Sequence, residues 1–184
     1  ELAVEPFAIK DLIAWKNSPR RRPLLVQGAR QVGKTWLIRE FGQTHFAAVA
    51  YVNFLEDEAM ARQFEGELAP ARLLDAVTLY TGVNAKDPNT LVVFDEIQEC
   101  PRALTSLKSF AERSPETALV AAGSLLGVAL HRGVSFPVGK VDHLLIYPLS
   151  FDEFLLATGN NLMLDTLRRG DLALADSLSE RYIE

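Results

Sequence analysis

The chain has 184 residues and a net charge of −5, with 48% hydrophobic and 23% charged residues. That length suffices for one globular domain with a sizeable core, and the negative charge argues against a protein whose whole surface binds nucleic acid. Its single cysteine excludes an intrachain disulfide, and no apolar run reaches the ~20 residues of a membrane helix, so we expect a cytoplasmic protein with no membrane partner.

Helix-like and strand-like segments alternate along the chain. A helical stripe over residues 7–18 ends before Pro19, because the residue preceding a proline avoids the helical region. Near-continuous apolar runs, typical of strands buried on both faces, occupy residues 23–28, 47–54, 89–96, 117–123 and 141–149. Further helical patterns occupy residues 34–42, 57–65, 70–80, 102–113, 125–131, 150–158, 161–169 and 171–181. This alternation predicts an α/β protein with a mainly parallel five-stranded sheet and helices on both faces.

A glycine-containing motif joins the first predicted strand to the helix that follows it. Residues 28–35 read GARQVGKT and fit the pattern G-x-x-x-x-G-K-[ST] at each fixed position. The two glycines let the backbone turn tightly and direct N–H groups at phosphate oxygens, while the following helix adds its positive dipole end. Lys34 is expected to reach the β- and γ-phosphates, and the Thr35 hydroxyl to bind Mg²⁺.

We therefore predict that the whole loop and the residue after it bind the nucleotide. These residues are Gly28, Ala29, Arg30, Gln31, Val32, Gly33, Lys34, Thr35 and Trp36. Within the variable stretch, Arg30 and Gln31 either touch phosphate or face solvent. Trp36 also fits a simpler interpretation as a core or helix-face residue.

A pair of carboxylates ends the third predicted strand. The run LVVFDE places Asp95 and Glu96 directly after four apolar residues. In a phosphate-binding protein, an acid at the end of a neighbouring buried strand holds Mg²⁺ through water. Asp95 is expected to take that role, and Glu96 to polarise the water that attacks the γ-phosphate. The alternative is that the two acids cap the next helix.

A hydroxyl follows the fourth predicted strand. Ser124 ends the run TALVAAGS, at the carboxyl end of a strand expected to lie between the other two. Ligands of open α/β sheets bind at that edge, so we predict that Ser124 senses the γ-phosphate. It could equally be the N-cap of the following helix.

Other polar residues give weaker signals. The basic run of residues 20–22 reads as a solvated face or as a nucleic-acid contact. Four cations are candidates for stabilising charge on the γ-phosphate, in place or from a neighbouring subunit, although a solvated cation is the favoured interpretation of each one. They are Arg102, Arg113, Arg132 and Lys140.

Several of these motifs, in this order, resemble the ATPase domain of a large group of prokaryotic AAA-like P-loop ATPases. The resemblance is carried by GARQVGKT, by VVFDEIQECPRALTSLKSF, by AAGSLLG and by SFPVGKVDHLLIYPLSFDEF. It implies a three-layer α/β/α P-loop NTPase sandwich of the additional-strand type, with the Ser124 strand between the loop strand and the Asp95 strand. Residues 28–35 correspond to the Walker A loop, Asp95 and Glu96 to the Walker B pair, and Ser124 to the first sensor.

The same resemblance bears on domain organisation and partners. It implies that residues 1–184 form the ATPase domain, with 150–184 a helical segment leading toward a C-terminal region that this sequence lacks. A protein or DNA partner would bind through that region, and the wider superfamily often forms oligomers.

Two functions are compatible with these residues. The first is an ATPase that cleaves ATP to ADP and phosphate with Mg²⁺ and couples the reaction to a conformational change. The second is a nucleotide-gated regulatory module with little hydrolysis of its own. A GTPase is disfavoured, because no glycine lies three residues after Asp95 and no Asn-Lys-x-Asp run is present to recognise guanine.

Overall fold

The computed structural model describes residues 7–124, 139–148, 152, 155 and 159–171. The chain divides into two compact units, one of residues Ala8–Ile146 and one of Glu1–Phe7 with Tyr147–Glu184. The first unit contains the sheet. The predicted helices at 125–131, 150–158 and 171–181 lie wholly or mostly outside the described residues.

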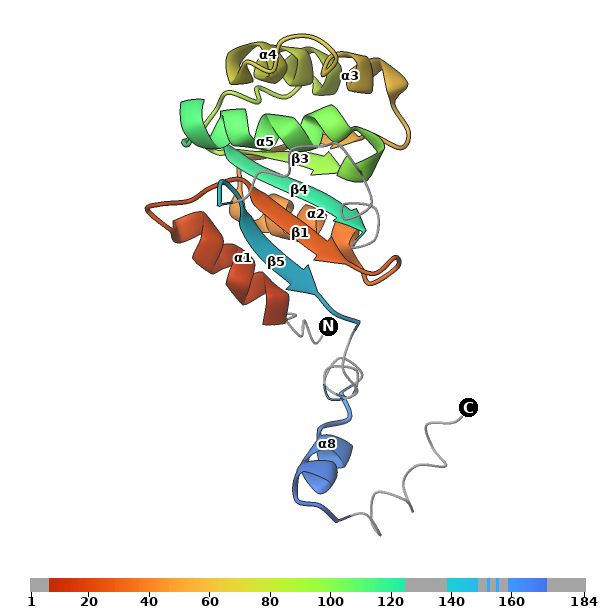
Figure 1. Ribbon diagram of the computed structural model, residues 1–184. Helices are drawn as coiled ribbons and strands as arrows, with labels where there is room; N and C mark the ends of the chain where they lie inside the picture. The colour runs from red at the N-terminus through yellow and green to blue at the C-terminus, as the bar shows by residue number, and fades with distance from the viewer. Residues whose placement is uncertain (1–6, 125–138, 149–151, 153–154, 156–158, 172–184) are drawn as a thin grey trace. The chain divides into compact units, whose positions relative to one another are not determined.

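All five predicted strands are present and form one parallel sheet. Their order across the sheet is β2-β3-β4-β1-β5 (Figure 1). The strands are β1 (Leu24–Gly28), β2 (Ala48–Asn53), β3 (Thr90–Asp95), β4 (Ala118–Ser124) and β5 (Asp142–Ile146). The prediction of a parallel five-stranded sheet is confirmed, and β4 lies between the loop strand and the Asp95 strand as expected.

Helices cover both faces of this sheet, so the unit is a three-layer sandwich. On one face, α1 (Phe7–Asn17) and α2 (Lys34–His45) share a core with alternate residues of β1, β3 and β4. On the other face, α3 (Glu58–Arg62), α4 (Pro70–Thr81) and α5 (Pro101–Arg113) pack on the remaining strand residues (Figure 1). Every residue of β3 is buried, which explains why its sequence shows no alternation.

Local sequence signals set the helix boundaries on the α3–α5 face. Proline begins both α4 and α5, where its missing N–H costs nothing. The Asp57 carboxylate caps α3 by accepting the Met60 N–H at 2.8 Å. The predicted helix over 57–65 is shorter than expected, because after Arg62 the backbone N–H groups bond three residues back rather than four. This tighter turn accompanies the complete burial of Phe64.

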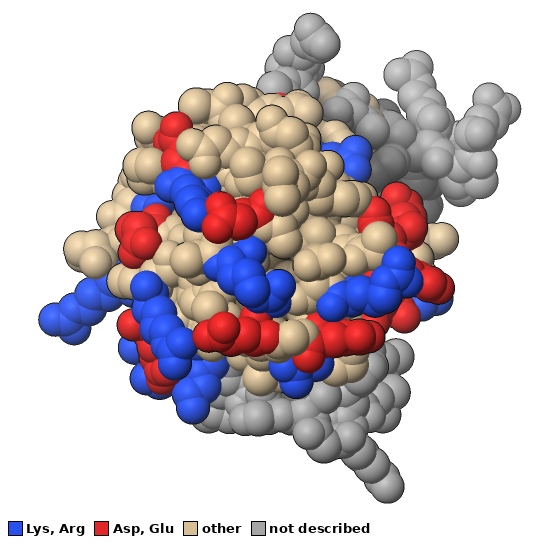
Figure 2. Space-filling view, turned by 90° about the horizontal axis from the view of Figure 1, so that it is seen from above, with Lys and Arg blue, Asp and Glu red and all other residues tan. Residues whose placement is uncertain are grey.

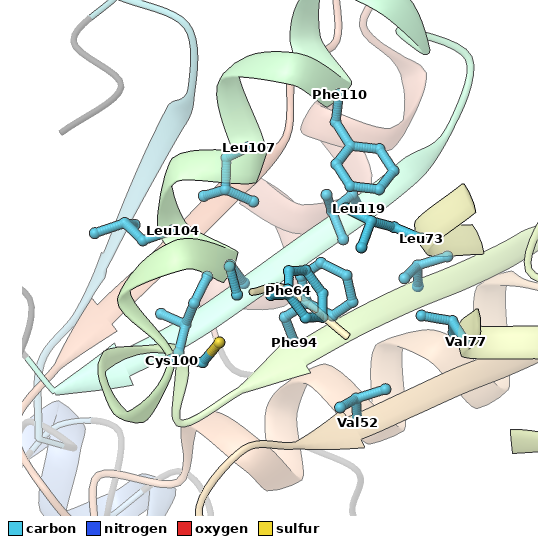
Figure 3. Packing of buried hydrophobic residues seen from close by; sticks show 14 of the residues in the cluster. Val52, Phe64, Leu73, Val77, Phe94, Cys100, Leu104, Leu107, Phe110 and Leu119 are labelled. Atoms are coloured by element: carbon cyan, nitrogen blue, oxygen red, sulfur yellow. The ribbon is translucent and has the colours of Figure 1, made fainter. Parts of the chain in front are cut away.

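The aromatic cluster beneath β3 supports the end of that strand. The Phe94 ring lies 5.6 Å from the ring of Phe54, 5.4 Å from that of Phe64 and 6.2 Å from that of Phe110 between centroids. Each of these three contacts is edge-to-face, and the rings lie in the core that the sheet shares with α5. Figure 3 shows Phe64, Phe94 and Phe110 within this core. Because Phe94 directly precedes Asp95, this packing holds the strand end that carries the acid.

The second unit is described chiefly through α8 (Asn161–Arg168). Met163 and Leu164 of this helix form a small apolar cluster with Leu155. The Arg168 guanidinium lies 3.3 Å from the Asp152 carboxylate, an exposed ion pair of little energetic weight.

A matched pair of leucine substitutions tests the core assignment. Leu107→Ala in α5 is expected to lower the free energy of unfolding by about 2–5 kcal/mol, because Leu107 is fully buried in the α3–α5 core. Leu79→Ala in α4 is the control, since Leu79 is 87% exposed, and about 0.5 kcal/mol or less is expected. Urea unfolding measures both, and equal losses would contradict the arrangement.

Candidate functional site

The predicted phosphate loop connects β1 to α2. β1 ends at Gly28, and α2 begins at Lys34. Between them the backbone enters the left-handed region twice, at Gln31 (φ 64°) and at Gly33 (φ 85°). Arg30 and Gln31 are both exposed. The loop therefore has the tight turns expected from its sequence, with Arg30 and Gln31 exposed while Val32 packs against the core.

The two glycines of the loop are needed for different reasons. Gly33 has a positive φ that side-chain-bearing residues rarely adopt, and a Cβ there would meet no neighbouring atom. Gly28 has no such backbone, but a Cβ would lie 2.5 Å from the Ile146 carbonyl oxygen and 3.1 Å from the Val32 side chain. The absence of a side chain at Gly28 thus allows β5 to pair directly alongside the loop.

Lys34 directs its ammonium group back to the start of the loop. The side chain is buried, and Nζ donates to the Ala29 carbonyl at 2.6 Å and to the Gly28 carbonyl at 3.1 Å. Burial lowers the pKa of Lys34, while the negative charges of Glu96 and Asp95 act in the opposite direction. The positive charge is therefore held at the loop, close to two carboxylates.

Asp95 is the most constrained residue of the site. It is only 2% exposed, at the carboxyl end of β3. Its Oδ2 accepts hydrogen bonds from the Thr35 hydroxyl at 2.7 Å and from the Tyr51 hydroxyl at 2.6 Å. Its Oδ1 accepts from the backbone N–H of Glu96 at 2.9 Å. The two predicted metal-binding residues, Thr35 and Asp95, are thus in direct contact.

Glu96 adopts a left-handed backbone (φ 49°), uncommon for a residue with a side chain. A short 3₁₀ helix, Ile97–Glu99, follows it, and Glu96 makes no side-chain cap hydrogen bond to that helix. Instead, its carboxylate accepts from the Gln98 side-chain amide, which also lies 3.4 Å from the Glu99 carboxylate. The Glu96 side chain therefore bonds to Gln98 and does not cap the helix that follows it.

Ser124 and Trp36 lie near the same edge of the sheet. Ser124 ends β4 and pairs in register with Gly28, so it is adjacent to the start of the loop. The helix it might cap lies outside the described residues. Trp36 is 58% exposed in the first turn of α2, which excludes the core interpretation for this residue. Both remain candidates for contacting a ligand.

The basic run of residues 20–22 is largely used within the fold. The Arg21 guanidinium donates to the Glu116 carbonyl at 2.7 Å and lies 5.5 Å from the Trp15 ring. Arg22 donates from its side chain to the Gly139 carbonyl at 2.7 Å. These contacts connect the residues before β1 to the segments that precede β4 and β5, at the end of β1 opposite to the phosphate loop. Arg21 is partly buried, whereas Arg20 and Arg22 are exposed, as the solvated-face interpretation expects.

Two of the four cations considered for the γ-phosphate, Arg102 and Lys140, bind other groups of the protein. Arg102 donates to the Phe64 carbonyl at 2.6 Å and to the Gly66 carbonyl at 2.7 Å. Lys140 lies 3.1 Å from the Glu112 carboxylate. Arg113 is exposed in the last turn of α5, and Arg132 lies outside the described residues. Arg102 and Lys140 therefore serve structural contacts in this state.

The surface over α3 and α4 mixes both signs of charge (Figure 2). Lys86 pairs with Asp75 at 2.5 Å, and Arg62 lies 3.9 Å from Glu58. Such alternation is unlike the continuous basic surface of a nucleic-acid footprint. Within the described part of the chain, no helix is long and apolar enough to cross a membrane, and no cluster of three or more His, Cys, Asp or Glu residues could hold a metal ion by itself.

Two residues of the site had not been predicted from the sequence. Tyr51, in the middle of β2, reaches Asp95 across the sheet, and Gln98 reaches Glu96 from the following turn. The only sequence signal for Tyr51 is a hydroxyl-bearing side chain within an apolar strand. Sequence spacing alone does not reveal that β2 lies beside β3.

A comparison with protein families found a match for the chain. The model of a family described as an AAA domain matches residues 20–155, which include the loop, the Asp95 strand and the Ser124 strand. The resemblance noted in the sequence is thereby confirmed. A comparison with curated proteins gave no match.

Solved structures with a similar fold include two larger proteins. The Pif1 helicase from Candida albicans shares 13% identity with a TM-score of 0.40, over 88% of this chain and 42% of the helicase chain. PCH-2 from C. elegans shares 16% identity with a TM-score of 0.44, over 89% of this chain and 46% of PCH-2. The chain thus spans less than half the length of either structure.

A pair of glycine substitutions tests the packing of the loop against β5. Gly28→Ala is expected to lower the free energy of unfolding by about 1–3 kcal/mol, because the added methyl group meets the Ile146 carbonyl. Gly66→Ala is the control, because its Cβ would lie 3.8 Å from its nearest neighbour and its effect on the unfolded chain is similar. Denaturant unfolding compares the two variants. A Gly28→Ala protein as stable as Gly66→Ala would show that the close approach of β5 is not required.

Proposed function

The chain belongs to the AAA domain family and is a P-loop ATPase-type nucleotide-binding domain, and we propose that it hydrolyses ATP to ADP and phosphate in a Mg²⁺-dependent reaction. The observation that supports this most directly is the contact between Thr35 and Asp95 beside the buried Lys34. This group lies at the carboxyl edge of the parallel sheet, where ligands of open α/β folds bind.

The oxygen atoms at this edge fit Mg²⁺. The ion prefers oxygen ligands, keeps several waters and takes only one or two groups from the protein besides substrate phosphates. The Thr35 hydroxyl would be its protein ligand, and the Asp95 carboxylate, 2.7 Å from that hydroxyl, would hold it through water. When bound, the metal would neutralise charge on the β- and γ-phosphates.

The chain's own residues would perform the remaining steps. Lys34 would direct its ammonium charge at the phosphates, together with the backbone N–H groups of the loop. Glu96 would take a proton from the water whose oxygen attacks the γ-phosphorus, as the bond to the bridging oxygen breaks and ADP leaves. Ser124, adjacent to Gly28 on β4, would detect the γ-phosphate through its hydroxyl.

The coupling of this reaction to a conformational change, and to a protein or DNA partner, is part of the same proposal. AAA ATPases often assemble into oligomers, in which a neighbouring subunit can supply an arginine to the γ-phosphate. The lone Cys100 is free and buried, which is compatible with the proposed cytoplasmic location.

A second candidate function, a nucleotide-gated regulatory module with slow hydrolysis, is favoured by one contact. The Glu96 carboxylate already accepts a hydrogen bond from the Gln98 amide. A glutamate held in this way is less available to a water molecule. In that case nucleotide binding, rather than turnover, would be the functional event.

Nucleotide binding is tested by thermal unfolding with Mg²⁺ alone and then with Mg²⁺ plus ATP, a slowly hydrolysed ATP analogue or GTP. ATP and the analogue at about 100 times their dissociation constants should stabilise the protein by ~2.7 kcal/mol, whereas GTP should not. Lys34→Ala should lose most of this stabilisation, and Lys108→Ala, on the exposed side of α5, should retain it. Stabilisation of the Lys34→Ala protein equal to that of wild type would remove Lys34 from the nucleotide site.

Substitution of Glu96 separates hydrolysis from binding. Glu96→Gln should reduce the rate of phosphate release by roughly 10²–10⁴-fold, because a general base contributes about that much, while ATP still raises the unfolding temperature. Glu67→Gln, the same change at an exposed position, should leave the rate unchanged. If the wild-type protein binds ATP but releases no phosphate, the regulatory module becomes the better description.

A further inference from the structure

The acceptor positions of Asp95 are almost fully used. An ionised carboxylate offers about four lone-pair positions. Both positions on Oδ2 are taken, one by the Thr35 hydroxyl at 2.7 Å and one by the Tyr51 hydroxyl at 2.6 Å. The Glu96 N–H takes one position on Oδ1 at 2.9 Å. One position on Oδ1 is therefore left for a further donor.

The three donors come from three different segments, and only Tyr51 belongs to neither the phosphate loop nor the Asp95–Glu96 pair. Tyr51 lies on β2, opposite Val93 of the neighbouring β3, two residues before the pair Asn53 and Asp95. Tyr51, Val93 and Asp95 consequently share one face of the sheet, the face covered by α2. This register allows the long phenol side chain to run along the sheet and reach the acid.

The Tyr51 ring is itself held in place. The Arg39 guanidinium of α2 lies 4.2 Å from the ring centroid, within the range of a cation–π contact. Burial, together with the hydrogen bond to Asp95 and its negative charge, raises the pKa of Tyr51, and the hydrogen bond and positive charge of Arg39 act in the opposite direction. A phenol is protonated at physiological pH even without such a shift, so the hydroxyl acts as the donor in its 2.6 Å contact with the carboxylate.

We propose that Tyr51 is a positioning residue for the metal site, which orients the Asp95 carboxylate so that its remaining Oδ1 position faces a metal-bound water. This inference rests on the proposed Mg²⁺-dependent nucleotide function. Without the Tyr51 hydroxyl, Asp95 Oδ2 loses one of its two donors, and only the Thr35 hydroxyl and the Glu96 N–H still restrict the orientation of the carboxylate. Groups that orient metal-site carboxylates in this way commonly change metal affinity when they are removed.

The experiment measures the Mg²⁺ requirement of ATP binding, not the rate of hydrolysis. The unfolding temperature of the full chain is followed during a Mg²⁺ titration at fixed ATP, and separately during an ATP titration in EDTA. For Tyr51→Phe, the Mg²⁺ concentration at half-maximal stabilisation should rise about tenfold or more. Its ATP affinity in EDTA should match that of wild type, because Lys34 and the loop are unchanged.

Tyr80→Phe is the matched control. Tyr80 lies on α4, which packs on the opposite face of the sheet, and its hydroxyl contacts Asp57 rather than Asp95. It should keep the wild-type Mg²⁺ midpoint. A Tyr51→Phe protein that is folded and has an unchanged midpoint would overturn the proposal. A lower unfolding temperature without ligand, with no change in midpoint, would likewise show that Tyr51 is only structural.

A second variant covers the case in which Tyr51→Phe does not fold. Arg39→Gln removes the cation above the ring and leaves both hydroxyls in place. It should raise the Mg²⁺ midpoint by about twofold to fivefold, in proportion to a single cation–π contact, and no rise would overturn the proposal. A wild-type protein stabilised by ATP to the same extent with and without Mg²⁺ would instead refute the proposed metal-dependent function, and this inference with it.

Discussion

The hydrogen-bonded Asp95 carboxylate joins the phosphate loop, the sheet edge and the turn that carries Glu96. A buried charge is costly unless donors surround it, and Asp95 is 2% exposed. The required donors come from α2, from β2 and from the backbone that follows β3. The same three contacts that make burial of this charge tolerable also determine where Thr35 and Glu96 lie. The stability of the strand end at Asp95 and the geometry of the site therefore depend on the same atoms.

Packing in the core beneath β3 holds the end of this strand, and with it Asp95, in place. Phe94 precedes Asp95 and contacts three aromatic rings, Phe54 and Phe64 from the segment after β2 and Phe110 from α5. Because the strand alternates faces, Phe94 points into the α3–α5 core while Asp95 points toward α2. Aromatic packing on one face of the sheet thus holds Phe94, and hydrogen bonds on the other face hold Asp95.

Several arginine side chains connect distant backbone segments through hydrogen bonds. Arg21, Arg22 and Arg102 each donate to main-chain carbonyls of segments far away in the sequence. A guanidinium with several donors in a plane suits this purpose, because it can satisfy carbonyl groups that no helix or strand partner reaches. Two of the three arginines in the run of residues 20–22 are used in this way.

The sequence by itself determined the strand–helix alternation, the phosphate loop and the Asp95–Glu96 pair, because each depends on local chemistry. Apolar runs report strands buried on both faces, and the glycines and lysine of the loop have fixed spacing. The family resemblance added the position of β4 between β1 and β3. Only the tertiary structure decided that Tyr51 and Thr35 share one oxygen of Asp95, that Gly28 accommodates the β5 backbone, and that Gln98 engages Glu96. These contacts join residues through strand order and register, and no local pattern encodes those long-range relations.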